Sequence, residues 1–396
     1  MHGRKTLALI ALLTTTAACA GESAGSSPAP ARKAGPPQAA KIRLIGDGST
    51  SDTGPQPRPT GFKATRLAPG EKPPQFVVFS WDGAGATDGQ MARFRALSKR
   101  YGASMTFFLS GLYTVPMEER HVYKGPGHAR GASDIPFFSA EGVHETIRNI
   151  GLAWREGHEI GTHFNGHFCG PSGVRSWTPA DWADEIRQAK RFVSTWKTTT
   201  GFKDLPPLPF DYDKELIGSR APCLEGRPGL LPAARRLGWR YDSSGTGLQI
   251  WPKKRKGLWD VPLQSIPMPG HAFEVLSMDY NFLANQSGAR LNGPSYKHGS
   301  WRRQTDRALS LGFQRAYNGN RAPMIIGNHF EQWNGGIYMD AVAGFMEKIA
   351  DIPGVQMVSF RQLCDWLDKQ DPKILARLRT LGVAQPPQTG WTRFLG

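Results

Sequence analysis

Short apolar runs alternate with longer amphipathic segments along most of the chain, and this alternation predicts its secondary structure. Apolar and aromatic runs predict buried strands at residues 76–80, 105–109, 159–162, 216–219, 239–242, 260–265, 324–327 and 355–359. Apolar residues three and four positions apart predict helices at residues 91–101, 142–156, 179–198, 338–351 and 360–369. Strands that alternate with helices form parallel βα units. The pattern therefore predicts an α/β barrel or doubly wound sheet, with its site at the carboxyl ends of the strands.

The first 74 residues differ from the rest of the chain in their amino-acid composition. A positively charged start and an apolar stretch at residues 7–13 predict an export signal over residues 1–18. Cys19 ends a Thr-Ala-Ala-Cys segment that resembles a bacterial lipobox, so we expect a lipoprotein anchored to the outer face of the cell membrane. The alternative is an ordinary signal peptide and a secreted protein. Residues 19–74 are rich in Ala, Pro, Gly and Ser, which predicts a disordered tether.

Composition and charge narrow the class of protein. The 396 residues include 20 Phe, 12 Trp and 9 Tyr, enough apolar mass for a sizeable core. No apolar run reaches the roughly 18 residues that a membrane-spanning helix needs. The formal net charge of +16 favours anionic surroundings. The cations are scattered, however, and the densest run, residues 253–256, is typical of a solvated loop. We therefore expect no nucleic-acid partner, and no protein partner is implied.

Polar residues suited to catalysis lie where several predicted strands end. Asp82 follows the first strand, His163 and His167 lie four residues apart, Arg220 follows another strand, and His329 follows residues 324–327. On a helical turn, two histidines with this spacing would face one divalent metal. Each residue also has an ordinary explanation, such as a turn residue, a surface ion pair or a core histidine. Their shared position at strand ends favours a functional site.

Segments in the same order resemble the motifs of the polysaccharide deacetylase family, including its chitin-deacetylase-like members. These segments are residues 80–84 (Ser-Trp-Asp-Gly-Ala), 158–167, 218–222 (Gly-Ser-Arg-Ala-Pro), 241–244, 258–262 and 320–333. The resemblance implies a single distorted parallel (β/α) barrel over residues 75–368, preceded by the disordered tether and followed by a C-terminal tail at residues 369–396. It also implies a metal-dependent hydrolase that removes N-acetyl groups from an amino-sugar polymer or oligomer, such as peptidoglycan, a chitin-like chain or another envelope glycan.

The resemblance assigns a role to each candidate residue. His163 and His167 would ligate a divalent metal, zinc or a similar ion, which polarises the acetyl carbonyl and lowers the pKa of bound water. Asp82 would act as the general base, and His329 would protonate the leaving amine. Arg220 would hold Asp82 ionised, because an adjacent guanidinium favours a carboxylate.

Further residues border this expected site. The backbone N–H of Cys223 falls where the family places an oxyanion donor. Trp259 and Trp333 are candidates for sugar stacking or for an acetyl pocket, although core residues would look the same in the sequence. Because their motifs border one site, Cys169 and Cys223 are a candidate disulfide, with two unconnected thiols as the alternative. Cys364 is expected to be a buried free thiol.

One position departs from the family pattern. The first motif normally has two consecutive aspartates, a base and a metal ligand, but Gly83 stands at the second position. If the alignment is shifted by one, Asp82 becomes the ligand and Trp81 replaces the base. Otherwise Asp88 or Asp134 could complete the metal site, whose affinity would be lower without a charged ligand. The alternative function is therefore a catalytically weak or inactive glycan-binding lipoprotein on the same barrel.

Overall fold

The computed structural model describes residues 42–396 except 59, 86 and 88, and these residues belong to one compact unit. Its centre is a curled sheet with the strand order β13-β3-β4-β5-β6-β7-β10-β9, in which β14 also pairs with β3. The strands are β3 (Gln75–Gly83), β4 (Thr106–Leu109), β5 (Glu159–Thr162), β6 (Gly218–Ser219), β7 (Tyr241–Asp242), β9 (Lys253–Arg255), β10 (Leu258–Asp260), β13 (Met324–Asn328) and β14 (Val355–Met357). All pairs in this sheet are parallel except β9 with β10. Parallel pairing places the carboxyl ends of the strands at one edge.

The curled sheet does not close by its own hydrogen bonds. A second sheet, with the order β12-β11-β8, lies between its two ends and consists of β8 (Thr246–Gly247), β11 (Leu263–Pro267) and β12 (Glu274–Leu276). Its connection back to β13 is a bridge between Met278 and Gly327. The fold is therefore a distorted parallel (β/α) barrel, as the sequence predicted. The run predicted as one strand at 260–265 is divided between β10 and β11.

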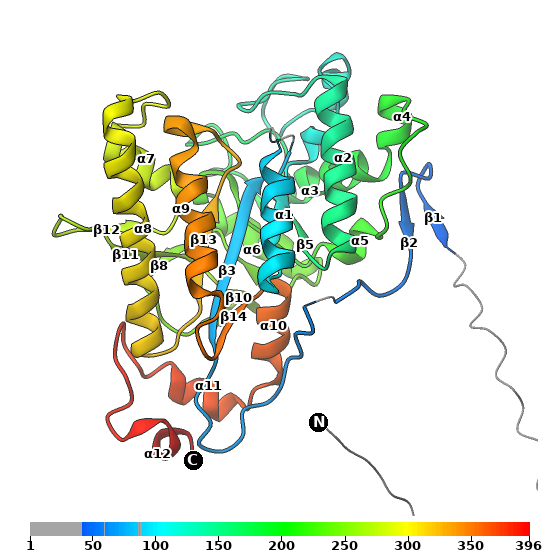
Figure 1. The fold of residues 1–396 in the computed structure, drawn as a ribbon. Coiled ribbons are helices and arrows are strands. Elements are labelled where there is room, and N and C mark those ends of the chain that lie inside the picture. Colours follow the sequence, from blue (N-terminus) through cyan, green and yellow to red (C-terminus); the bar gives the residue numbers. More distant parts are fainter. Residues whose placement is uncertain (1–41, 59, 86, 88) are drawn as a thin grey trace, which may run out of the picture. The chain divides into compact units, whose positions relative to one another are not determined.

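Helices cover the outside of the barrel (Figure 1). The longer ones are α1 (Gln90–Tyr101), α2 (Ala140–Arg155), α3 (Pro179–Ser194), α6 (Arg227–Arg236), α7 (Asp279–Ser287), α8 (Ser295–Asn318), α9 (Trp333–Ala350) and α10 (Phe360–Lys369). The shorter ones are α4 (Trp196–Thr200), α5 (Tyr212–Glu215), α11 (Pro372–Leu378), α12 (Gly390–Leu395) and the 3-10 turns η1 (Gly111–Thr114), η2 (Met117–Val122) and η3 (Pro222–Leu224). Helices α8, α9, α1 and α2 run side by side. No helix of the described chain is long and apolar enough to cross a membrane.

Part of the segment expected as a tether belongs to the fold. Residues 42–74 belong to the compact unit, in which β1 (Arg43–Ile45) and β2 (Thr50–Asp52) form an antiparallel hairpin. This hairpin is fixed because Trp196 Nε1 donates to the Ser49 carbonyl at 2.8 Å and the Ser51 N–H donates to the Leu208 carbonyl at 2.8 Å. The tether assignment is wrong for residues 42–74. Residues 1–41, with the predicted signal and Cys19, lie outside the described residues.

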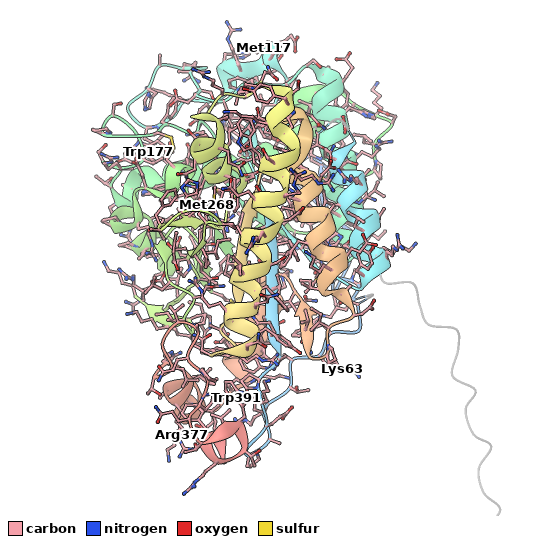
Figure 2. The ribbon with its side chains drawn as sticks, turned by 60° about the vertical axis from the view of Figure 1, so that its left-hand side comes forward. Lys63, Met117, Trp177, Met268, Arg377 and Trp391 are labelled. Carbon is pink, nitrogen blue, oxygen red and sulfur yellow. A yellow bond between two sulfur atoms is a disulfide. The ribbon has the colours of Figure 1, made fainter. Side chains whose placement is uncertain are left out.

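The C-terminal residues are also part of the fold. Residues 369–396, expected as a tail, form α11 and α12, which Figure 2 shows around Arg377 and Trp391. They pack onto a core cluster that includes Phe76 and Trp366, whose ring centroids are 5.0 Å apart. The Leu67 N–H donates to Gln370 Oε1 at 2.9 Å, which joins the segment before β3 to the segment after α10. The basic run at residues 253–256 is another difference, since its first three residues form the exposed edge strand β9 rather than a loop.

Candidate active site

A cavity with two lobes opens at the carboxyl ends of the barrel strands. The lobes have volumes of about 330 and 590 Å³. They share five lining residues, Asp82, His163, His167, Tyr280 and His329. The residues predicted as base, metal ligands and acid therefore meet at the junction of the two lobes.

Asp82 is held by a buried guanidinium. Successive side chains of a strand point to opposite faces, so Ser80 and Asp82 of β3 share a face, and both meet Arg220. Arg220 Nη1 donates to Asp82 Oδ1 and to Ser80 Oγ, each at 2.9 Å, and Nη2 donates to Ser243 Oγ at 2.9 Å. Burial alone would raise the pKa of Asp82, but the Arg220 charge, together with His163 and His329, outweighs burial and lowers the pKa from 3.8. Asp82 is thus ionised at neutral pH.

His163 and His167 converge from a loop rather than from a helical turn. Phe164 and His167 have φ of 64° and 56°, left-handed values that exclude the helical geometry expected from the spacing. The imidazole centroids are nevertheless 5.0 Å apart. His163 Nδ1 lies 2.8 Å from the Arg220 carbonyl, which can only accept, so Nδ1 carries the proton and Nε2 keeps its lone pair. Burial lowers the pKa of both histidines, that of His163 to about 3, so both are neutral.

A buried carboxyl that the sequence did not reveal fixes the histidine loop. Glu185 Oε1, on α3, accepts the Asn165 N–H at 3.0 Å and the Gly166 N–H at 3.2 Å, and Tyr123 Oη donates to Glu185 at 3.1 Å. Burial raises the pKa of Glu185 to about 7. Glu185 falls among the buried positions of α3 with Trp182, Ile186 and Ala189. A charged residue on an apolar helix face is the sequence signal that could have identified it.

His329 is paired with Asp279, a second residue that the sequence did not reveal. His329 Nδ1 lies 2.8 Å from Asp279 Oδ1, and the His329 backbone N–H donates to Asp279 Oδ2 at 2.6 Å. Burial lowers the pKa of His329, but the Asp279 charge and hydrogen bond outweigh it and raise the pKa to about 9. His329 is therefore protonated at neutral pH. The ring of Trp333 lies 5.3 Å from that of His329 and 5.9 Å from that of Tyr280, in the cavity wall.

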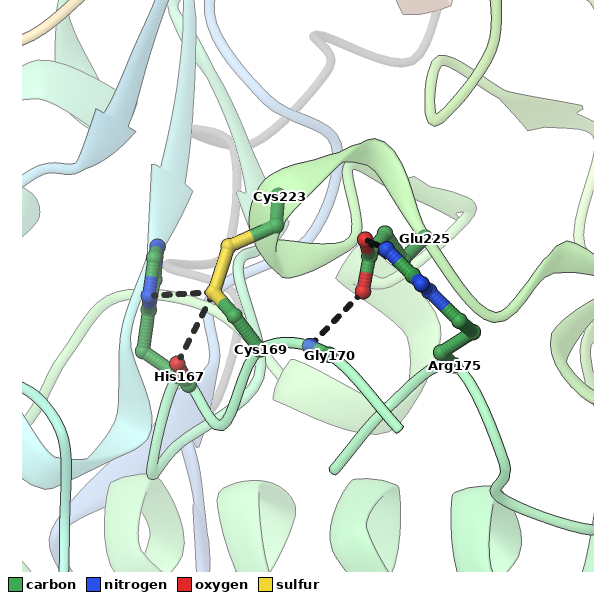
Figure 3. Close-up of a disulfide and its surroundings, with 6 residues drawn as sticks. All are labelled: His167, Cys169, Gly170, Arg175, Cys223 and Glu225. Carbon is green, nitrogen blue, oxygen red and sulfur yellow. Dashed lines mark hydrogen bonds and ion pairs between the residues drawn. A yellow bond between two sulfur atoms is a disulfide. The ribbon is translucent and has the colours of Figure 1, made fainter. Parts of the chain in front are cut away.

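The structure joins Cys169 and Cys223 in a disulfide with α-carbons 6.0 Å apart (Figure 3). Cys364 is a buried free cysteine. Cys169 Sγ lies 3.7 Å from His167 Nδ1, so the disulfide supports one side of the histidine loop. These two sulfurs and the His167 ring are close enough together to resemble a metal site. Thiolates are the metal ligands, however, and the sulfurs of a disulfide are not thiolates. Cys223 also lines the larger lobe, with a left-handed φ of 54°.

The register of β3 decides between the two alignments of the first motif. Trp81 is buried on the face of the strand opposite Asp82, and its ring stacks on Phe330 with centroids 5.2 Å apart. The structure therefore favours the unshifted alignment, because Trp81 packs against the rings of Phe94, Phe107 and Phe330 and lines neither lobe. Gly83 has a φ of 85°, and a Cβ there would lie 3.2 Å from Tyr113 Cε2. The space of the missing carboxylate is thus bordered by an aromatic ring.

The remaining candidates differ in how close they lie to the junction of the two lobes. Trp259 is buried in the core cluster beneath α10, where its Nε1 donates to Asp368 Oδ1 at 2.9 Å. Trp259 lines neither lobe, so the structure does not support its assignment to the substrate side. The Asp134 backbone N–H donates to the Gly166 carbonyl at 2.8 Å, beside the histidine loop. The charge of Asp134 opposes the lowering of the His167 pKa, but among the described residues Asp134 does not form a group of metal-ligand geometry with the two histidines. Asp88 lies outside the described residues.

The donor groups at the junction fit a divalent metal in type. Neutral imidazole nitrogens are the commonest ligands for zinc, and the carbonyl bonded to His163 fixes its tautomer with Nε2 available. His163 and His167 are thus the residues that would hold the ion. Gly83 has no side chain and supplies no carboxylate ligand. The site should therefore bind a metal more weakly than one with two imidazoles and an adjacent carboxylate.

Comparisons with known proteins give structural matches alone. No family model matches the sequence, and no curated protein matches it. Similar solved structures include a candidate polysaccharide deacetylase from Mycobacterium smegmatis, with 13% identity, a TM-score of 0.46, and coverage of 78% of this chain and 97% of that chain. A CE4 family pseudoenzyme from Bacillus anthracis has 11% identity and a TM-score of 0.40 over 78% and 71% of the two chains. A peptidoglycan deacetylase from Bacillus subtilis has 13% identity and a TM-score of 0.38 over 75% and 93%.

Proposed function

We propose that this chain is a polysaccharide-deacetylase-like hydrolase that removes N-acetyl groups from an amino-sugar polymer or oligomer with the help of a divalent metal. The observation that carries the proposal is that a deprotonated carboxylate and a protonated imidazole lie together where the two lobes of the cavity meet. Asp82 is ionised beside Arg220, and His329 is protonated beside Asp279. Environments that separate the pKa values of two neighbouring groups are the mark of a general base and a general acid.

Each residue has a separate role in the proposed amide hydrolysis. Asp82 accepts a proton from the attacking water, and Arg220 keeps its carboxylate ionised and oriented. His329 donates its proton to the leaving nitrogen, so that the amine departs without carrying negative charge. Polarisation of the amide carbonyl is the chemistry that a divalent ion held by His163 and His167 would supply.

A specific observation favours a second function, glycan binding with weak or absent catalysis. Gly83 supplies no ligand, and the Tyr113 ring borders the space where a carboxylate would lie. A cavity with aromatic walls can bind a sugar whether or not the metal is retained. The alternative therefore predicts binding of N-acetylglucosamine oligomers without acetate release.

Acetate release separates the two functions. The purified protein is stripped with a chelator, reloaded with zinc, cobalt or manganese, and incubated with N-acetylglucosamine oligomers. We expect metal-dependent release, and a loss of about 10²–10⁴-fold in Asp82→Asn, the range for a general base. The exposed carboxylate variant Asp204→Asn is the matched control and should retain activity. Oligomer binding without release under every metal would support the alternative, and equal release by Asp82→Asn would remove Asp82 as the base.

Metal content tests the ligand assignment independently of activity. We expect His163→Ala and His167→Ala to lose bound metal while the far-ultraviolet circular dichroism stays unchanged, because both side chains extend from a loop. His144→Ala is the control, since His144 lies on α2 and pairs with Asp204. Unchanged metal stoichiometry in both site variants would refute the assignment.

The cellular location is part of the same proposal. A lipid on Cys19 would hold the enzyme at the outer face of the membrane, where envelope glycans are the accessible substrates. Partition into a detergent phase should be lost in Cys19→Ser. A wild-type protein found in the aqueous phase would favour a secreted enzyme.

A further inference from the structure

We propose that the larger lobe of the cavity accepts an acyl chain longer than acetyl, so that the substrates include amino sugars with medium-chain N-acyl groups. This inference rests on the proposed function, because it names the substrate class of that same site. It depends on how the lobe is lined, how large it is and where it meets the catalytic residues.

The larger lobe has an aliphatic wall. Beyond the five shared residues, its lining consists of Ala221, Cys223, Leu224, Thr246, Leu276, Met278 and Asn281. Most of these side chains are apolar, and the cysteine presents the sulfur of a disulfide rather than a thiol. Such a wall offers few partners for sugar hydroxyls, each of which would lose hydrogen bonds to water on entry. A hydrocarbon chain loses none.

The smaller lobe is lined by aromatic rings and polar side chains instead. Its wall includes the rings of Tyr113, Phe138 and Trp333 and the polar side chains of Thr87 and Ser110. Aromatic faces next to hydrogen-bonding groups suit an amphipathic sugar ring. The two lobes meet at the catalytic junction, where the scissile amide must lie. The sugar on the nitrogen and the chain on the carbonyl then extend into different lobes, and the lining assigns the acyl chain to the aliphatic one.

The volume of the lobe exceeds what acetyl requires. A cavity of about 150 Å³ holds benzene, and one water accounts for about 30 Å³ of liquid. The lobe measures about 590 Å³, a space in the range of pockets that hold drug-sized molecules. The methyl of an acetyl group would leave most of this apolar space to water. Each methylene added to the acyl chain would instead displace water from an aliphatic wall.

A series of acyl lengths tests the inference. The metal-loaded protein is given N-acetyl-, N-butanoyl-, N-hexanoyl- and N-octanoylglucosamine, and the released glucosamine is the common product measured. We expect kcat/KM to rise by up to about fourfold per added methylene until the lobe is filled, from the usual benefit of burying a methylene. The highest kcat/KM for the acetyl substrate, with steadily lower values for longer chains, would overturn the inference and leave the proposed function intact.

Variants connect the chain-length preference to the lobe. Leu224 has a φ of 58°, a conformation that asparagine tolerates, so Leu224→Asn introduces a polar group without added backbone strain. We expect the hexanoyl-to-acetyl ratio of kcat/KM to fall at least tenfold in this variant. Leu152→Asn is the matched control on α2, where Leu152 is 39% exposed. An unchanged ratio in Leu224→Asn would overturn the assignment of the chain to this lobe.

A binding measurement keeps the inference testable without catalysis. If no member of the series is hydrolysed, the proposed function fails, and calorimetric dissociation constants for the same compounds decide the inference. Affinity that rises with acyl length, and less so in Leu224→Asn, would support an acyl-binding lobe. Affinity that rises only with the number of sugars would assign both lobes to a glycan chain and overturn it.

Discussion

Replacement of Arg220 by methionine would leave the Asp82 carboxylate buried without its cation. The Arg220 side chain is fully buried, with hydrogen bonds to Asp82, Ser80 and Ser243, and its guanidinium carbon lies 4.9 Å from the centroid of the Phe108 ring. Methionine has a similar length and fills much of the same space. The substitution therefore removes the charge and the donors more than the packing.

The expected loss of stability follows from the burial of the Arg220–Asp82 ion pair. Breaking a buried ion pair by removing one partner typically destabilises a protein by about 3–5 kcal/mol, because the remaining charge is uncompensated. In the wild type, the lowered pKa of Asp82 contributes stability above its unfolded value of about 3.9, and this contribution is lost as the pH falls through the folded pKa. Without Arg220, burial raises that pKa, so the folded variant is favoured at low pH. The deficit in the free energy of unfolding should shrink between pH 7 and pH 4.

Guanidinium unfolding followed by tryptophan fluorescence measures this deficit. We expect a loss of about 3–5 kcal/mol for Arg220→Met at pH 7, a clearly smaller loss near pH 4, and partial recovery in Arg220→Met/Asp82→Asn, which removes the unpaired charge. Asp204→Asn is again the control. A loss below about 1 kcal/mol, or an equal loss at both pH values with no recovery in the double variant, would refute the electrostatic reasoning.

Three further changes test other parts of the site. Asp279→Asn should move the alkaline limit of activity, set by the His329 pKa of about 9, to lower pH, and an unmoved pH–rate profile would contradict this. Cys223→Ser should cost about 4 kcal/mol of unfolding free energy, since the disulfide closes a 54-residue separation, and reduced wild type should match it. Gly83→Asp should raise zinc affinity in calorimetry chiefly when combined with Tyr113→Ala, because the new Cβ lies 3.2 Å from that ring. Equal gains in the single and double variants would show that the ring does not interfere.

The sequence predicted those elements whose apolar pattern is local and strong. Strand β5 and helix α10 lie at the predicted residues, and Ser359 caps the start of α10 in a capping box completed by Gln362. Helix α8 was missed although it is 24 residues long. Its core-facing positions include small or polar residues such as Thr305, Ala308 and Gly312, which do not register as an apolar stripe.

Site residues that belong to sequence motifs could be predicted. Residues that reach the site only through tertiary contacts could not. Asp82 and His329 could be found because they follow strands, but their partners come from elsewhere in the chain. Asp279 lies 50 residues from His329, in a helix that the pattern did not predict. Trp259 and Trp333 show the same limit, since one is core and the other lines the cavity. Only the packing of neighbouring elements distinguishes them.

The packing of the C-terminal helices against the segment that leads into β3 has a consequence for biosynthesis. Phe76, at the start of β3, belongs to the same core cluster as Leu395, and Gln370 is bonded to the backbone at both Thr65 and Leu67. Chains are made from the amino end, and domains fold as units. The core around Phe76 therefore stays open until the final residues leave the ribosome. A stop codon even thirty residues early would release a chain with an exposed apolar surface, which is a substrate for proteases.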